Sequence, residues 1–199
     1  MKKFLGLLAA GCLIAPFAAR ADSEFSVVLQ GGATKYNQSL SSGTDTGAEY
    51  GARLGIMPTP IVGFEVGYLG SQNNVRDSLN QGRNTGTLRT NGGYGDLRVN
   101  VLPGAVTPYV FGGFGATHFD APNGNGDFGL QSKTVATIPF GGGLETNIGA
   151  FKLGGRFQYN YLFDKIYSGS NPTATGVSVD KGGNADFYGV SLDLGASFR

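Results

Sequence analysis

The chain has 199 residues, and its composition is unlike that of an ordinary soluble enzyme: it holds 35 glycines, 14 phenylalanines and 9 tyrosines, but no tryptophan and few charged residues. The formal net charge of +1 gives no reason to expect a nucleic-acid partner. The only cysteine is Cys12, so a disulfide framework and a cysteine-ligated zinc site are excluded.

The first element has the parts of a secretory signal peptide. Met1-Lys2-Lys3 is positively charged, an apolar run follows over 4–17, and an A-x-A site formed by Ala19 and Ala21 precedes the polar Asp22. About 14 apolar residues are too few for a helix that spans a bilayer. We therefore expect a cleaved signal peptide at 1–21 and a mature domain over 22–199 that begins at Asp22.

A second interpretation of this region is a lipoprotein signal. The segment LAAGC at 8–12 resembles a lipobox, in which Cys12 would be acylated. However, the chain stays apolar from Cys12 through Phe17, which is typical of an unfinished signal peptide and not of a polar tether. Cleavage after Ala21 is the preferred prediction.

The rest of the chain predicts β-strands. Apolar and polar residues alternate in short stretches that Gly, Pro, Asn and Asp interrupt. No later segment has the 18 or so consecutive apolar residues of a membrane helix, so any membrane would be crossed by strands. The predicted strands are 24–36, 48–58, 62–72, 90–102, 107–119, 134–147, 151–164 and 185–199.

The connections between these strands alternate in length. Polar, solvated loops are predicted at 37–47, 73–89, 120–133 and 165–184, and tight turns at 58–61, 103–106 and 147–150. An up-and-down membrane barrel has short turns at one end and long loops at the other. The sequence therefore predicts an all-β fold: an eight-stranded antiparallel transmembrane β-barrel with short periplasmic turns and long extracellular loops.

The two faces of each strand differ. In the last strand, for example, Leu192 and Leu194 alternate with Ser191 and Asp193. A soluble lipocalin-like barrel would show the same alternation, but charges midway along the polar faces favour an inside-out barrel with a lumen that side chains fill. Because buried charges must pair, we expect a lumen network of three cations and four anions: Arg53, Arg98, Arg156, Glu65, Asp96, Glu145 and Asp193.

Aromatic residues gather near the predicted strand ends, as in the girdles that face lipid headgroups. The alternative is that these rings pack in an ordinary sheet core. The predicted inner girdle is Phe25, Phe64, Phe151 and Phe198, and the predicted outer girdle is Tyr36, Tyr50, Tyr159, Tyr161 and Tyr188.

The mature chain resembles the small outer-membrane barrels of the OmpA and OmpX kind. The resemblance rests on the export signal, on strands such as TPYVFGGFGATHF (107–119) and FKLGGRFQYNYLF (151–163), and on the closing YGVSLDLGASF (188–198). It implies a bacterial outer-membrane location, contact with lipopolysaccharide and phospholipid, and folding by the barrel-assembly machinery. One departure is that Phe198 is penultimate, whereas the terminal strand of such barrels usually ends on the aromatic residue.

The candidate chemical motifs are weak. His118 is the only histidine, and Asp120 stands where barrel enzymes that deacylate lipid A have a serine, so the nucleophile is missing. Asn123, Asn125 and Asp127 have the spacing of calcium ligands, but the glycine and the glutamate of a calcium loop are absent. The glycine strings at 112–115 and 141–143 open no helix that could bind phosphate. We expect neither catalysis nor a cofactor nor a metal.

The preferred hypothesis is a monomeric barrel with a salt-bridged lumen and a structural or surface-interaction role that the long loops carry. If the lumen is salt-bridged, removal of Arg156 or Glu65 should open it. The alternative is a narrow, porin-like channel for small solutes, in which the lumen charges select what passes. A lipid-modifying enzyme that uses His118 and a soluble periplasmic barrel that binds an apolar ligand are the other hypotheses.

Overall fold

The computed structural model describes residues 23–37, 44–76, 84–120, 132–163 and 186–198. These residues form eight strands in chain order: β1 (Glu24–Tyr36), β2 (Gly47–Met57), β3 (Val62–Arg76), β4 (Asn84–Asn100), β5 (Val106–Asp120), β6 (Lys133–Ile148), β7 (Phe151–Leu162) and β8 (Phe187–Phe198). In the described part of the chain, no helix is long and apolar enough to cross a membrane.

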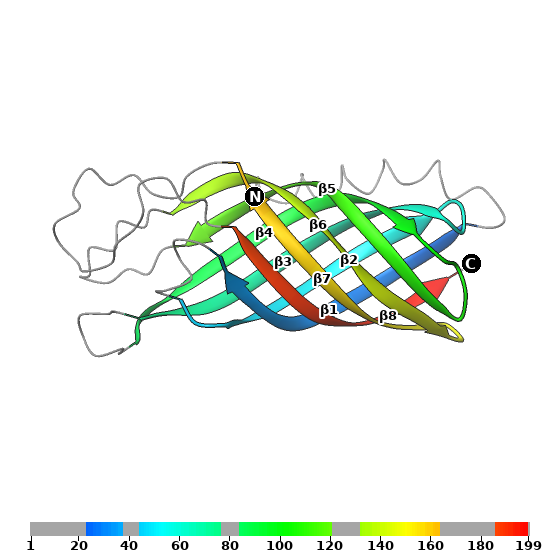
Figure 1. Ribbon diagram of the computed structural model, residues 1–199, viewed down its shortest axis with the longest axis horizontal. Coiled ribbons are helices and arrows are strands. Elements are labelled where there is room, and N and C mark those ends of the chain that lie inside the picture. The colour runs from blue at the N-terminus through cyan, green and yellow to red at the C-terminus, as the bar shows by residue number, and fades with distance from the viewer. Residues whose placement is uncertain (1–22, 38–43, 77–83, 121–131, 164–185, 199) are drawn as a thin grey trace, which may run out of the picture.

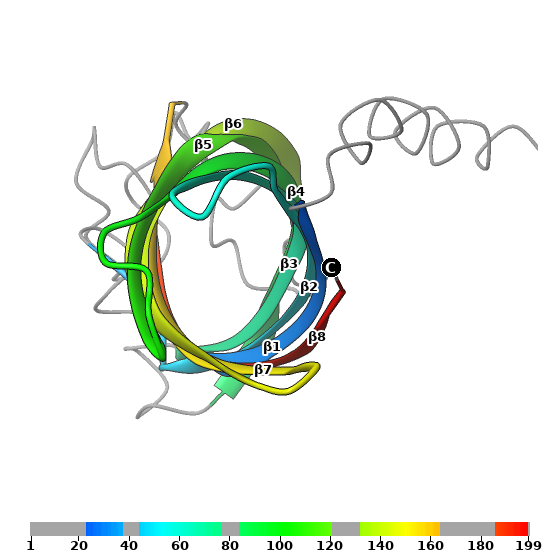
Figure 2. The same ribbon diagram turned by 90° about the vertical axis from the view of Figure 1, so that its right-hand side faces the viewer.

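The strands close into one antiparallel up-and-down barrel, in which each strand pairs with its neighbours in sequence and β8 pairs with β1. The strands run obliquely along the long axis (Figure 1), and the end-on view shows a closed ring (Figure 2). The predicted fold class is therefore confirmed. Closure removes free sheet edges, so every strand can satisfy its backbone within the wall.

The two ends of the barrel differ in their connections. At one end, here named the turn end, the strands are joined through residues 58–61, 101–105 and 149–150, close to where β1 begins and β8 finishes. Gly149 has a φ of 64°, a left-handed conformation that favours glycine in the tight β6–β7 turn. The opposite end is named the loop end, and most of its connections lie outside the described residues.

The second predicted loop, 73–89, is largely wrong. Residues 73–76 and 84–89 continue β3 and β4 as a paired hairpin, with Asn73 opposite Leu88 and Asn74 opposite Thr87. The prediction interpreted the polar side chains as a solvated loop. However, alternating residues rich in threonine are compatible with a strand. Leu88, at the base of the hairpin, is buried. The first connection is also anchored, because the Asp45 backbone N–H donates to the Asn74 carbonyl.

One inter-strand ladder is interrupted. Pairing between β5 and β6 stops after Gly112–Phe140 and resumes at Gly115–Thr137 without a change of register. Pro139 stands opposite Gly113 in this gap, and proline has no N–H to donate to the Gly113 carbonyl. The ladder is therefore weakest at this point of the wall.

Candidate functional site in the barrel lumen

The inward-facing side chains fill the lumen in three levels. The level nearest the turn end is an ion network that consists of Glu24, Arg53, Glu65, Asp96, Arg98, Glu145, Lys152, Arg156 and Asp193. Above it lies a hydroxyl belt that consists of Thr34, Ser71, Thr90, Thr117 and Thr137. At the loop end lies an apolar plug that consists of Tyr36, Leu69, Leu88, Phe119, Val135, Leu162 and Phe187. Leu69 precedes Ser71 on β3 and extends the plug down to the level of the hydroxyl belt.

The ion network begins at the turn end with Lys152. Its Nζ lies 2.8 Å from Glu24 Oε1 and 2.8 Å from Glu145 Oε1, so that it joins β7 to β1 and β6. Arg98 then contacts both oxygens of Glu145, at 2.8 and 2.9 Å, and Glu65 at 3.2 Å. The planar guanidinium suits such two-pronged pairing with a carboxylate.

Glu65 is the centre of the network. Its carboxylate lies 2.7 Å from Arg156 and 3.6 Å from Arg53, in addition to Arg98. Arg156 also donates to Asp96 at 2.8 Å, and it does so across the lumen, from β7 to β4. Each of these side chains is at most 4% exposed, so the charges compensate one another in place of water.

Arg53 and the aromatic rings complete this level. Arg53 donates to Asp193 at 2.6 Å and to Gln30 at 2.9 Å. The Arg156 guanidinium carbon lies 3.3 Å from the Phe111 ring centre, and that of Arg98 lies 3.9 Å from the Tyr109 ring centre. Stacking on a ring face gives a buried guanidinium a further favourable contact.

The structure brings all seven predicted lumen charges into the ion network, but the prediction missed Glu24, Glu49 and Lys152. All three are buried and lie on the inward faces of their strands. Lys152 shares its face with Arg156 at a spacing of four residues, so strict alternation from the β6–β7 turn could have identified it. On the described strands, the inward charges are therefore four cations and six carboxylates, not three and four.

Glu49 stands apart from the ion network. It is 4% exposed, and its Oε2 atom has no hydrogen-bond partner among the described residues. The same atom would lie 2.0 Å from a Cβ at position 189, so the carboxylate reaches across β1 to the space that Gly189 leaves. Glu49 therefore adds a carboxylate on the loop-end side of the ion network. This carboxylate takes no part in the contacts between arginines and carboxylates described above.

The hydroxyl belt forms paired contacts across neighbouring strands. Ser71 and Thr90 lie 2.6 Å apart through their hydroxyl oxygens, and Thr117 and Thr137 lie 2.9 Å apart. A small cavity at this level reaches from Tyr94 and Asn160 to Phe187 of the plug. It has room for about one water molecule.

The apolar plug closes the loop end of the lumen. Its seven side chains come from every strand except β2, and each is at most 7% exposed. Tyr36, Phe119 and Phe187 form the aromatic centre, with ring centres 5.6 to 6.5 Å apart. The prediction contained no such plug: Tyr36 was assigned to the outer girdle, and Leu88 fell within the predicted loop 73–89.

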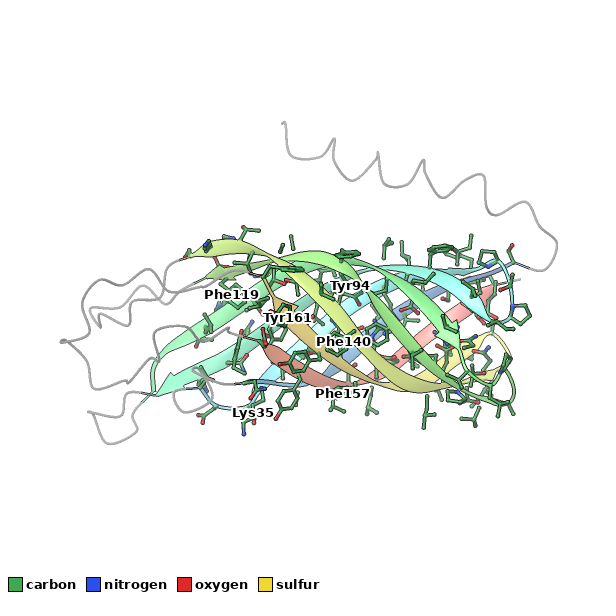
Figure 3. All side chains as sticks on the ribbon, turned by 45° about the horizontal axis from the view of Figure 1, so that its top comes forward. Lys35, Tyr94, Phe119, Phe140, Phe157 and Tyr161 are labelled. Carbon is green, nitrogen blue, oxygen red and sulfur yellow. The ribbon has the colours of Figure 1, made fainter. Side chains whose placement is uncertain are left out.

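Most of the predicted girdle residues lie on the outer wall. Phe25, Phe64, Phe151 and Phe198 are exposed near the turn end, Tyr50 and Tyr161 are exposed nearer the loop end, and Tyr159 and Tyr188 are partly exposed. Figure 3 shows other rings of the same wall, Phe140 and Phe157, which are also exposed.

Tyr36 is a correction to the predicted girdle, because it is 1% exposed and lies inside the barrel. Even-numbered residues of β1 point inward, and Tyr36 pairs with the inward-facing Phe187. Tyr68, which the prediction did not assign to the girdle, is exposed and packs beside Tyr50 with ring centres 6.5 Å apart.

The residues of the candidate chemical motifs do not converge on a catalytic centre. His118 and Asp120 lie on the outer wall, half-exposed, with Nε2 and Oδ1 3.2 Å apart. Among the described residues, no group of three or more His, Cys, Asp or Glu could hold a metal ion. The calcium-like segment 123–127 and the cleavage-site residues Ala19, Ala21 and Asp22 lie outside the described residues, as does Cys12.

Comparisons with known proteins agree with this architecture. Residues 5–199 match the family model of the outer membrane protein β-barrel domain. No curated protein matches the chain. Among solved structures, Neisserial surface protein A (NspA) has a TM-score of 0.61 at 15% identity, with 87% of this chain and 97% of that chain covered.

Two further solved barrels are similar. Ail of Yersinia pestis, the attachment invasion locus protein, has a TM-score of 0.52 at 12% identity and covers 88% of this chain and 99% of its own. OprG of Pseudomonas aeruginosa has a TM-score of 0.52 at 13% identity and covers 87% of this chain and 96% of its own. At these identities the likeness concerns the fold. The chain belongs to the outer membrane protein β-barrel domain family and is an integral β-barrel protein of the bacterial outer membrane.

Proposed function

We propose that this protein is a sealed barrel with a structural or surface-interaction role, and that its function is carried at the loop end and not by passage of solutes through the lumen. The observation that carries the proposal is the ion network, in which buried side chains from opposite walls meet at 2.6 to 3.2 Å. Side chains that span the lumen in this way leave no continuous aqueous path through that level.

The energetic argument supports a permanently filled lumen. Removal of one partner of a buried ion pair costs about 3–5 kcal/mol, because it leaves an uncompensated charge. A channel that opened through this level would have to break several such contacts of Arg53, Arg98 and Arg156 at once. The apolar plug is a second barrier, since an apolar constriction excludes water and ions.

A narrow, porin-like channel is the second candidate. The small cavity at the hydroxyl belt and the polar side chains between it and the turn end favour this candidate, since they would give a solute polar contacts over that part of the axis. The two candidates differ in one measurable property, which is the conductance of the folded barrel.

The test is single-channel recording in a planar lipid bilayer. Purified protein that keeps its compact electrophoretic form until boiled is the folded sample, and a known porin reconstituted in the same way is the control for insertion. We expect no discrete current steps above the bilayer baseline. Reproducible steps from the folded sample would reject the sealed barrel and favour the channel.

The surface-interaction role calls for a separate test. The β3–β4 hairpin projects at the loop end (Figure 1), and Lys35 and Arg89 are exposed there. Because Ail was solved with a heparin analogue, sucrose octasulfate, heparin is a suitable first probe. We expect retention of the folded protein on immobilised heparin, and weaker retention of the double variant Lys35→Gln, Arg89→Gln, which removes the two exposed cations. Equal retention of both proteins would favour a purely structural role.

The remaining elements of the proposal concern biogenesis and surroundings. We propose cleavage between Ala21 and Asp22, recognition of the final strand by the barrel-assembly machinery, and a monomer in contact with lipopolysaccharide and phospholipid. The N-terminal sequence of the protein purified from outer membranes tests the cleavage site directly.

A further inference from the structure

The outer wall carries a chain of polar contacts that crosses four strands. The Tyr68 hydroxyl of β3 donates to Asn91 Oδ1 of β4, and Asn91 Nδ2 donates to Asp120 Oδ2 of β5 at 3.5 Å. His118 Nε2 lies 3.2 Å from Asp120 Oδ1, and His118 Nδ1 lies 2.8 Å from the Thr134 hydroxyl of β6. These five residues are here named the outer polar belt.

The outer polar belt does not belong to the lumen. Its members occupy the outward positions of their strands, between inward neighbours such as Thr90, Thr117 and Phe119, which are buried. The His118 and Asp120 side chains are 45% and 50% exposed. The belt therefore faces whatever surrounds the barrel, which in an outer membrane is lipid.

The belt lies near the exposed tyrosines of the loop end, where we expect the outer boundary of the membrane. Tyr68 belongs both to the belt and to the exposed tyrosine pair with Tyr50. Tyrosines of this kind lie at the headgroup level, where their rings contact acyl chains and their hydroxyls contact water. Headgroups of the outer leaflet are thus the groups that the belt meets.

The boundary is asymmetric around the barrel. At the same end, β7, β8 and β2 present the rings of Tyr159, Tyr161, Tyr188 and Tyr50, whereas β4, β5 and β6 present Asn91, Asp120, His118 and Thr134. Ring-lined headgroup contact requires no particular headgroup. A row of alternating hydrogen-bond donors and acceptors requires a matching headgroup, because each polar atom is satisfied only by a complementary one.

The chemistry of the belt suits a phosphorylated sugar. Asn91 Nδ2 has a second N–H, and the Asp120 carboxylate and the Tyr68 and Thr134 hydroxyls have spare lone pairs. Arg89 is exposed and lies opposite Asp120 in the register of β4 and β5, within reach of this row for its long side chain. Sugar hydroxyls match the donors and acceptors, and a guanidinium matches phosphate.

The extent of the belt favours a headgroup larger than a single phosphate. Neighbouring strands lie about 4.8 Å apart, so the three steps from β3 to β6 span roughly 14 Å. That width suits a disaccharide and exceeds a phosphodiester. We propose that the outer polar belt binds the headgroup of one phosphorylated glycolipid of the outer leaflet.

The wall directly below the belt has room for an acyl chain. Gly93 and Ala116 pair there, beneath Asn91 and His118, and Gly95 follows opposite the highly exposed Phe114. A Cβ added at Gly93 or Gly95 would meet no atom closer than 3.9 Å, so no protein side chain fills this shallow area. An acyl chain that descends from the belt would lie against the β4–β5 wall beside Phe114.

The test measures lipid binding to the folded protein in detergent by native mass spectrometry, with bisphosphorylated lipid A and phosphatidylglycerol as separate probes. We expect lipid A to bind at least tenfold more tightly than phosphatidylglycerol. The double variant Asn91→Leu, His118→Leu should lose this preference, whereas Tyr188→Leu, on the opposite half of the boundary, should keep it. Equal binding of the two lipids by the unaltered protein, or a preference that survives the double variant, would overturn the proposal.

A second pair of variants tests the acyl-chain position and does not depend on the folding of the first. Gly93→Leu should weaken lipid A binding, because the new side chain occupies the open wall below the belt. Gly31→Leu on β1 is the matched control, since a Cβ added at Gly31 has nothing within 4 Å and is thus as free of contacts as one at Gly93. Equal binding by both variants would contradict the assigned position. None of these outcomes depends on whether the lumen conducts.

Discussion

At the scale of single residues, the lumen depends on side chains that contact several partners at once. Arg156 from β7 reaches Glu65 on β3 and Asp96 on β4, and its guanidinium stacks on Phe111 of β5. Lysine could not replace this geometry, because an ammonium has no planar fork to bind two carboxylates while one face covers a ring. Glu65 has the complementary position, with three arginines around one carboxylate.

Glu49 and Glu65 should respond in opposite directions to the same change. On the eight described strands, six inward carboxylates face four inward cations, and Glu49 Oε2 has no hydrogen-bond partner among the described residues. Glu49→Gln removes one excess negative charge and keeps the shape, so we expect stabilisation by about 1 kcal/mol. Glu65→Gln removes the negative charge that three buried arginines share, so we expect destabilisation by about 3 kcal/mol.

The measurement for this pair is the urea midpoint of unfolding in detergent micelles at pH 8, where carboxylates at their ordinary pKa are ionised. Gln158→Glu, which adds a seventh inward carboxylate beside Arg156, is a further comparison and should also lower the midpoint. A lower midpoint for Glu49→Gln would mean that Glu49 has an essential partner that the charge count does not reveal.

At the scale of the strands, alternation was the most informative property of the sequence. It identified all eight strands and the seven charges of the predicted lumen network, because a period of two assigns each residue to one face. It did not identify Lys152, since that residue lies at the first inward position after a turn. Tyr36 was placed on the outer face. Its position near a strand end, where girdle aromatics occur, was given more weight than the alternation of faces along the strand.

Levels along the barrel axis could not be predicted in the same way. The apolar plug unites Tyr36, Leu88 and Phe119 from strands far apart in sequence, and their common height depends on the shear of the closed barrel. The extent of the β3–β4 hairpin was missed for a related reason. Its polar residues pair across the hairpin, and cross-strand pairing is a property of register that local composition does not contain.

The adjacent glycines of β1 give a strand-level prediction. A Cβ at Gly32 would lie 2.0 Å from the Val190 carbonyl oxygen and 2.6 Å from the Ser191 Cα, which are backbone atoms of β8. A Cβ at Gly31 would meet nothing within 4 Å. We expect Gly32→Ala to destabilise the barrel by about 1–3 kcal/mol, because the β1–β8 closing pair must separate, and Gly31→Ala to be nearly neutral.

The measurement is refolding of each variant from urea into detergent micelles, followed by electrophoresis without boiling. The compact, faster-migrating fraction should fall for Gly32→Ala and remain as in the unaltered protein for Gly31→Ala. Equal fractions for the two variants would show that β8 can retreat from β1 at no cost, contrary to the continuous pairing from Phe25–Phe198 to Tyr36–Phe187.

At the scale of the whole molecule, the lumen has two barriers of different chemistry in series. The ion network fills the half nearer the turn end, and the apolar plug fills the loop end, with the hydroxyl belt between them. From the sequence alone, removal of Arg156 or Glu65 was expected to open the barrel. With the plug in place, that removal affects only one of the two barriers.

Conductance should therefore require both barriers to be removed. The network variant is Arg156→Ser with Glu65→Ser, which removes one cation and one anion and so preserves the balance of charge. The plug variant is Phe119→Ser with Phe187→Ser, which replaces two contacting rings by small polar side chains. We expect no current steps from either double variant and discrete steps from the quadruple variant, because an ion then meets neither paired charges nor an apolar constriction. Steps from the plug variant alone would mean that the ion network does not block the lumen, and silence of the quadruple variant would place the closure in the remaining residues of the network, with Arg53 and Arg98 the first to be tested.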